Sequence, residues 1–126
     1  MVTHPQTLDV MVASNLFGDI LTDLGAAVSG SLGVAPGANL NPPREHPSMF
    51  EPIHGSAPDI AGKGIANPIG AIWAAALMLE HLGQPDASHE IVTAIERVLA
   101  EGRVRTPDLG GTETTGDVTA AIVAEF

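Results

Sequence analysis

The chain has 126 residues, about enough for one domain. Its fifteen acidic and five basic residues give a net charge of -10, which argues against nucleic acid or an anionic membrane as partner, because both are bound through Lys and Arg clusters. The absence of cysteine excludes disulfides, zinc thiolates and thiol catalysis. The N-terminus lacks a signal-peptide pattern, and the longest apolar run, 69–79, is too short to span a bilayer, so we expect a soluble, cytoplasmic protein.

The first third of the chain predicts a strand, a helix and a loop. Residues 8–13 (LDVMVA) are apolar and end in polar Ser14-Asn15, which indicates a buried strand leading into a helix N-cap. Apolar residues then recur at helical spacing from Leu16 to about Val28. Glycine and proline interrupt the pattern after residue 29, and residues 39–47, with their prolines, predict a loop.

The rest of the chain predicts one short strand, a long loop and three helices. Residues 48–53 indicate the strand, whereas residues 54–67 are rich in Gly and Pro and have no period. Loops of that length inside compact domains are usually functional. Asn67-Pro68 is typical of a helix start, and Gly83 marks the end of that helix. The other expected elements are an amphipathic helix at 86–101, a loop at 105–115 and a helix at 116–125. Together they indicate an α/β fold.

Asp19 and Asp23 form the first candidate site. Four residues apart on a helix, their carboxylates lie on one face about one turn apart, where Mg²⁺ or Mn²⁺ would relieve their repulsion. Spacing alone favours the alternative, two solvated acids on an exposed face. Their mostly apolar neighbours weaken that alternative.

Two long segments resemble the β-decarboxylating dehydrogenases, the isocitrate, 3-isopropylmalate and D-malate/tartrate dehydrogenase family. They are NLFGDILTDLGAAVSGSLGV, residues 15–34, and FEPIHGSAPDIAGKGIANPIGAI, residues 50–72. The resemblance implies the C-terminal portion of that family's three-layer α/β/α fold. Residues 1–34 would end the small dimer-forming domain, which carries the metal-site helix, and residues 35–126 would return into the large NAD-binding domain. A Rossmann fold is rejected, because GKGIAN lacks the third glycine and a preceding strand.

The same resemblance implies the site residues. Asp19 and Asp23 match two metal-ligand aspartates, for Mg²⁺ or Mn²⁺. Asp59 with Ile60 matches the pair that selects NAD, because a carboxylate accepts both ribose hydroxyls and repels a 2′-phosphate. Without the resemblance, Asp59 is equally a turn former and His54 a structural histidine. The complete set of expected cofactor-binding residues is His54, Gly55, Ser56, Ala57, Asp59, Ile60 and Asn67.

Other parts of the family's site are expected to lie outside this chain. The family's catalytic tyrosine and lysine are placed upstream, and its third metal aspartate comes from the partner subunit of a homodimer. The chain has no tyrosine, and its single lysine, Lys63, lies in the loop at 54–67. We therefore expect the chain alone to be inactive, and to fold poorly, aggregate or need a complementing fragment, because its strands would leave exposed edges.

Residues 39–52 favour the D-malate/tartrate branch of the family. The expected function is NAD- and metal-dependent oxidative decarboxylation of a small 2-hydroxy dicarboxylic acid by the full-length enzyme, with 3-isopropylmalate as the alternative substrate. An alternative of another class is a non-catalytic fragment that binds nucleotide or forms a dimer interface. A third is a truncated reading frame whose start lies upstream.

Overall fold

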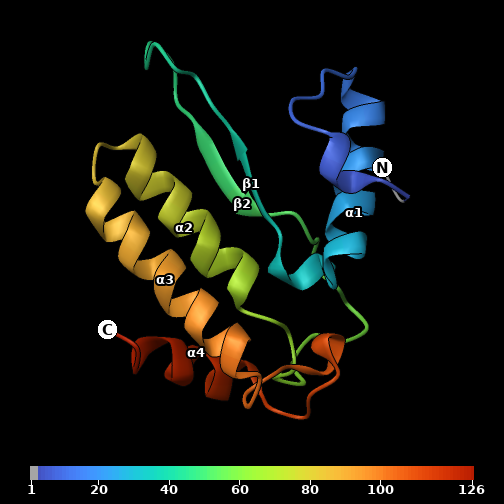
Figure 1. Ribbon diagram of the computed structural model, residues 1–126, viewed down its shortest axis with the longest axis vertical. Helices are drawn as coiled ribbons and strands as arrows, with labels where there is room; N and C mark the ends of the chain where they lie inside the picture. The colour runs from blue at the N-terminus through green and yellow to red at the C-terminus, as the bar shows by residue number, and fades with distance from the viewer. Residues whose placement is uncertain (1–2) are drawn as a thin grey trace.

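The computed structural model describes residues 3–126, which form a hairpin, a layer of packed helices and one helix beside them (Figure 1). The helices and strands are α1 (Asn15–Ser29), β1 (Pro36–Asn39), β2 (Met49–Pro52), α2 (Ile69–His81), α3 (Pro85–Glu101) and α4 (Thr115–Val123). Short 3-10 turns occupy Pro5–Thr7, Leu32–Val34 and Pro107–Leu109. All four predicted helices are therefore confirmed.

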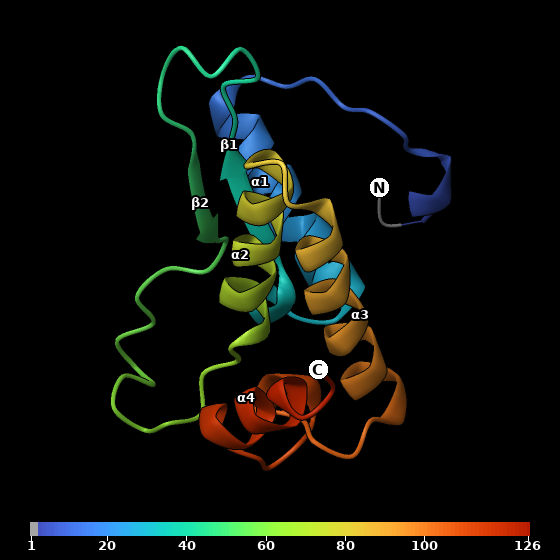
Figure 2. The same cartoon turned by 90° about the vertical axis from the view of Figure 1, so that its left-hand side faces the viewer.

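The predicted strand at residues 8–13 is wrong. These residues have no regular structure and are exposed, and residues 3–14 arc away from the rest of the molecule in Figure 2. The physical reason is that a strand is stable only when a neighbouring strand pairs with its backbone hydrogen-bonding groups. The one sheet among residues 3–126 consists of β1 and β2, so residues 8–13 have no strand to pair with there. The N-cap prediction holds, since α1 begins directly after Ser14.

The sheet is an antiparallel hairpin whose first strand the sequence did not predict. Pro36 pairs with Pro52 at one end, and Asn39 pairs with Met49 at the other. The proline and glycine of β1 do not indicate a strand in the sequence, because both residues are rare inside strands. Pro36 is tolerated as the first residue of an edge strand, where no ladder hydrogen bond is needed from its nitrogen. The predicted strand at 48–53 is confirmed as β2.

The core lies between α2, α3 and α4. Its fully buried residues are Ile69 from α2, Ala94, Ile95 and Val98 from α3, and Val118 and Ile122 from α4. Close packing at the start of α2 requires Gly70, because a Cβ there would lie 2.9 Å from the carbonyl oxygen of Gly33. The backbone that follows α1 is thereby held against the beginning of α2.

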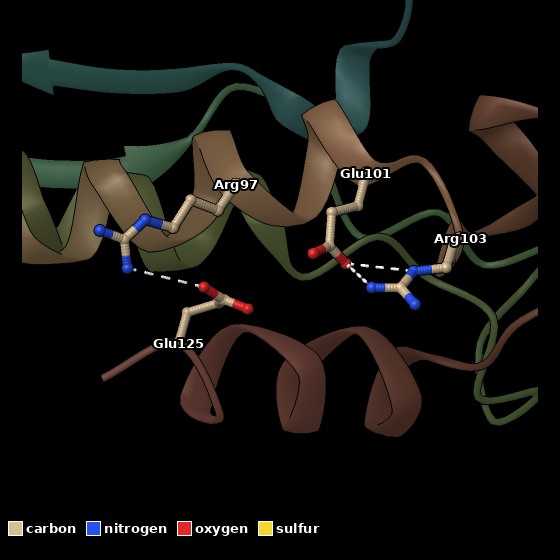
Figure 3. Close-up of polar contacts among 4 residues, drawn as sticks. All are labelled: Arg97, Glu101, Arg103 and Glu125. Carbon is tan, nitrogen blue, oxygen red and sulfur yellow. Dashed lines mark hydrogen bonds and ion pairs between the residues drawn. The ribbon is translucent and has the colours of Figure 1, made fainter.

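Local interactions end and connect the helices. Gly102 ends α3 with φ 64°, a left-handed conformation that favours glycine. Thr114 and Asp117 form a capping box at the start of α4. An ion pair of 3.6 Å joins Arg97 on α3 to Glu125 after α4 (Figure 3). Because Arg97 is well exposed, this pair contributes little to stability.

Between residues 3 and 126, every helix is too short or too polar to cross a bilayer.

Candidate functional site

A cavity of about 700 Å³ lies along the loop of residues 54–67, which we call the nucleotide loop after the role that the sequence resemblance implies for it. Three other segments complete its wall: Ser31–Gly33 after α1, Pro107–Asp108 in a 3-10 turn, and Thr115 at the start of α4. The nucleotide loop bulges outward from the hairpin before it returns to α2 (Figure 2). The long loop that the sequence predicted is therefore confirmed, and it borders a cavity.

Six of the seven predicted cofactor-binding residues line this cavity: His54, Gly55, Ser56, Ala57, Ile60 and Asn67. Asp59 does not line it and is exposed beside Ile60. The loop backbone is tightly turned, since Ala57 has φ 41° and Gly62 and Gly64 also have positive φ. A positive φ is uncommon in alanine, so the surrounding loop must hold Ala57 in that conformation.

Asn67 is buried, at 6% exposure, and its amide is engaged inside the protein. Its Oδ1 accepts a hydrogen bond of 3.0 Å from the backbone N–H of Ile69, at the start of α2. Its Nδ2 donates a hydrogen bond of 3.0 Å to Asp108 Oδ2. One amide hydrogen and the backbone of Asn67 are left for a ligand, which limits the contacts that Asn67 can make as a cofactor-binding residue.

Asp108 is the residue of this site that sequence reasoning missed. Its carboxylate accepts hydrogen bonds from the Ser31 hydroxyl and from Asn67. Burial would raise the pKa of the Asp108 carboxyl, but these hydrogen bonds to the charged form outweigh it and lower the pKa below its ordinary value of 3.8. Its sequence signal, Pro107-Asp108-Leu109-Gly110, is that of an ordinary turn.

Thr115 holds the nucleotide loop from the other side. Its backbone N–H donates a hydrogen bond of 2.8 Å to the Gly64 carbonyl, and its hydroxyl donates one of 2.5 Å to the Ala66 carbonyl. The segment 105–115, predicted only as a loop, therefore contacts the end of the nucleotide loop at three points. Gly33 also packs closely against the end of the loop, because a Cβ at this position would lie 2.7 Å from Asn67 Cβ.

Asp19 and Asp23 both lie on α1 and are exposed. Residues 3–126 contain no group of three or more His, Asp or Glu side chains placed to hold a metal ion. The two carboxylates can supply oxygen ligands to a hard cation, which takes at least six in total. Asp23 is six residues before the end of α1, about 9 Å along the helix axis, and the segment that lines the cavity begins two residues beyond that end, at Ser31. A ligand joining the two places must be elongated.

The family model for isocitrate/isopropylmalate dehydrogenase matches residues 1–122. The chain is 58% identical over 125 residues to a probable tartrate dehydrogenase/decarboxylase of Bacillus subtilis, covering 99% of this chain and 35% of that protein. It is also 58% identical over 126 residues to the decarboxylating D-malate dehydrogenase of Escherichia coli, covering 96% of this chain and 35% of that protein. The chain thus spans about a third of the length of these relatives.

Solved structures show the same fold. The isocitrate dehydrogenase of Methylococcus capsulatus superposes with a TM-score of 0.93 at 50% identity, over 99% of this chain and 37% of that one. A β-decarboxylating dehydrogenase of Thermococcus kodakarensis gives a TM-score of 0.77 at 48% identity, over 88% of this chain and 32% of that one. The predicted isocitrate dehydrogenase-like fold, present in part, is confirmed.

Proposed function

Because this chain belongs to the isocitrate/isopropylmalate dehydrogenase family, we propose that it is part of an NAD-dependent, divalent-metal-dependent dehydrogenase that oxidatively decarboxylates a small 2-hydroxy dicarboxylic acid of the D-malate/tartrate type. The observation that carries the proposal is the cavity of about 700 Å³ along the nucleotide loop. Its position agrees with six residues expected to bind the cofactor. The proposed activity is that of a longer protein.

The cavity fits the adenosine end of a dinucleotide. Gly55, Ser56 and Ala57 are small and let the backbone approach a nucleoside closely, while Ile60 gives the wall an apolar surface for the base. NAD, when bound, supplies the hydride acceptor. The part of the chain described here would bind and orient the adenosine end.

Asp59 supports NAD as the cofactor rather than NADP. Asp59 is exposed and directly precedes Ile60, which lines the cavity, so its carboxylate could accept hydrogen bonds from ribose hydroxyls. A 2′-phosphate at the same place would be repelled by the carboxylate. Asp108, which lines the cavity, adds a second negative charge to the site.

Asp19 and Asp23 would hold Mg²⁺ or Mn²⁺ together with oxygen ligands from the substrate, water and the rest of the longer protein. A bound divalent cation polarises the substrate's 2-hydroxyl and stabilises the enolate that decarboxylation leaves. The exposed apolar residues Leu16, Phe17 and Ile20 on the same helix support a homodimer of the longer protein. We accordingly propose that residues 1–34 belong to the dimer-forming domain and residues 35–126 to the NAD-binding domain.

A chimaeric enzyme tests this proposal. This chain replaces the matching third of the Bacillus subtilis relative, to which it is 58% identical, and NADH formation is measured with D-malate, tartrate and 3-isopropylmalate. We expect metal-dependent reduction of NAD with D-malate or tartrate, and loss of activity in Asp19→Asn and Asp23→Asn but not in the control Asp9→Asn. Preference for 3-isopropylmalate or for NADP, or full activity of both metal-site variants, would contradict the proposal.

A second candidate, nucleotide binding without catalysis, is favoured by a separate observation. Six of the expected cofactor-binding residues share one cavity, whereas the chain contains no tyrosine and residues 3–126 hold no group of three or more side chains placed to bind a metal ion. NAD binding by the 126-residue chain that is lost in Asp59→Ala, together with an inactive chimaera, would favour this candidate over the enzyme.

A further inference from the structure

We infer that Asp108 is the positioning residue of the nucleotide cavity: it holds the Asn67 amide, and with it the end of the nucleotide loop, against the segment that follows α1. The inference rests on the proposed function in taking the ligand to be NAD. Asp108 belongs neither to the nucleotide loop nor to the metal-site helix α1. Its carboxylate nevertheless accepts hydrogen bonds from Asn67, the last residue of the loop, and from Ser31, which follows α1.

A continuous chain of hydrogen bonds supports this role. The Gly33 N–H donates to Ser31 Oγ at 2.9 Å, and the Ser31 hydroxyl donates to Asp108 Oδ2. Asn67 Nδ2 donates to the same oxygen at 3.0 Å. On its other side, Asn67 accepts from the N–H of Ile69, which is 1% exposed. The carboxylate therefore links the segment that follows α1 to the last residue of the nucleotide loop, which lies just before α2.

The carboxylate also fixes which way the Asn67 amide faces. The N–H of Ile69 pairs with Oδ1, and the Asp108 carboxylate supplies the acceptor that Nδ2 needs in that same orientation. Without it, the buried amide would either lose a partner or turn its NH₂ group toward another N–H donor. Both outcomes leave a buried polar group unsatisfied, which is costly.

Packing leaves the amide little room to find another position. A Cβ at Gly33 would lie 2.7 Å from Asn67 Cβ and 2.8 Å from Asp108 Oδ2. There is therefore no room for a side chain at residue 33 beside the hydrogen bond between Asn67 and Asp108. Gly64 and Ala66 are held separately by Thr115. Thr115 thus restrains Gly64 and Ala66 near the end of the nucleotide loop, and Asp108 restrains Asn67, its last residue.

A donor–acceptor exchange tests the inference in the chimaeric enzyme, in which the Bacillus subtilis relative supplies the rest of the protein. Asn67→Asp places two carboxylates about 3 Å apart, where they repel. The double variant Asn67→Asp/Asp108→Asn restores the bond with its direction reversed, since an amide at 108 can donate to a carboxylate at 67. Asp108→Asn alone keeps an acceptor and should act weakly. Asp86→Asn, an exposed acid in the first turn of α3, is the matched control.

Two readouts are compared for each variant. The first is hydrogen exchange of the Ile69 amide and of the nucleotide loop in the ligand-free chimaera, and the second is the NAD dissociation constant from pH 7 to pH 5. We expect Asn67→Asp to speed exchange and weaken NAD binding by about tenfold, with partial recovery at pH 5, where the carboxyl pair can share a proton. The double variant should return close to wild type at every pH.

The possible results separate this inference from the proposed function. A double variant as impaired as Asn67→Asp, or an Asn67→Asp variant with wild-type exchange and binding, would overturn the positioning role. If Asn67→Asp does not fold, a folded double variant supports the role and an unfolded one overturns it. Failure of the unsubstituted chimaera to bind NAD would count against the proposed function, while the exchange rates in the ligand-free chimaera would still decide the role of Asp108.

Discussion

Helix α1 and the nucleotide cavity are built in opposite ways. The apolar residues of α1 point largely to solvent, with Leu16 at 67% and Phe17 at 62% exposure, and only Ala26 is buried. The cavity, in contrast, stands on the buried core of α2, α3 and α4 and on hydrogen bonds between three distant segments. One region leaves its apolar residues exposed, and the other is supported by buried packing and by hydrogen bonds within residues 3–126.

This difference bears on what each region can do by itself. The two carboxylates on α1 would supply part of the proposed cation site, and residues 3–126 place no third ligand beside them. The cavity is lined by four segments of the chain, and hydrogen bonds join these segments to one another. We therefore expect nucleotide binding to be separable from metal binding in this chain.

The largest difference should come from matched isoleucines. Ile95→Ala removes a side chain that is 2% exposed and should lower the free energy of unfolding by about 2–5 kcal/mol. Ile20→Ala on α1, which is 54% exposed, should change it by about 0.5 kcal/mol or less. Urea unfolding followed by circular dichroism measures both, and equal losses would contradict the difference in burial.

Two glycines give the next effect. Gly33→Ala should cost about 1–3 kcal/mol, because the new methyl group overlaps Asn67 and Asp108. Gly18→Ala on α1 meets no atom within 4 Å and should stabilise that helix by up to about 1 kcal/mol. Thermal melts of the two variants give the comparison, and a neutral Gly33→Ala would mean that the wall of the cavity yields easily.

The helix caps of the two regions should differ by less. Thr114→Ala breaks the capping box of α4 and should cost about 1 kcal/mol. Ser14→Ala at the start of α1 should cost almost nothing, because the Ser14 side chain makes no capping hydrogen bond. Unfolding midpoints that shift equally for both substitutions would contradict this expectation.

Low pH should destabilise the part of the fold around the cavity, because two carboxyls there, those of Asp108 and Asp117, have lowered pKa values. Hydrogen bonds from Thr114 lower the pKa of Asp117, and those from Ser31 and Asn67 lower the pKa of Asp108 against the effect of burial. A carboxyl whose pKa is lower in the folded state stabilises the fold above the unfolded-state value, and this stabilisation is lost as the pH falls through the folded-state value. The melting temperature should therefore fall below about pH 4, less steeply in Asp117→Asn. An unchanged slope in that variant would show that Asp117 contributes nothing.

The sequence predicts most of the fold wherever local patterns decide the structure. Helical periodicity places α1 and α3, and the glycines and prolines of residues 54–67 predict the loop. The prediction fails at residues 8–13 and at β1, because pairing with another strand, rather than composition, decides strand formation. Asp108 was also missed because contacts distant in sequence decide its role. Its partners Asn67 and Ser31 are 41 and 77 residues away along the chain.

The most direct test of the central claim is a titration of the 126-residue chain with NAD, in the presence of Mn²⁺ and again with a chelator. We predict saturable binding at one site with the same affinity in both conditions, and its loss in Asp59→Ala. No binding to a chain whose Ile69 amide is protected from exchange, or binding that requires Mn²⁺, would contradict the claim that the nucleotide cavity is complete and the metal site is not.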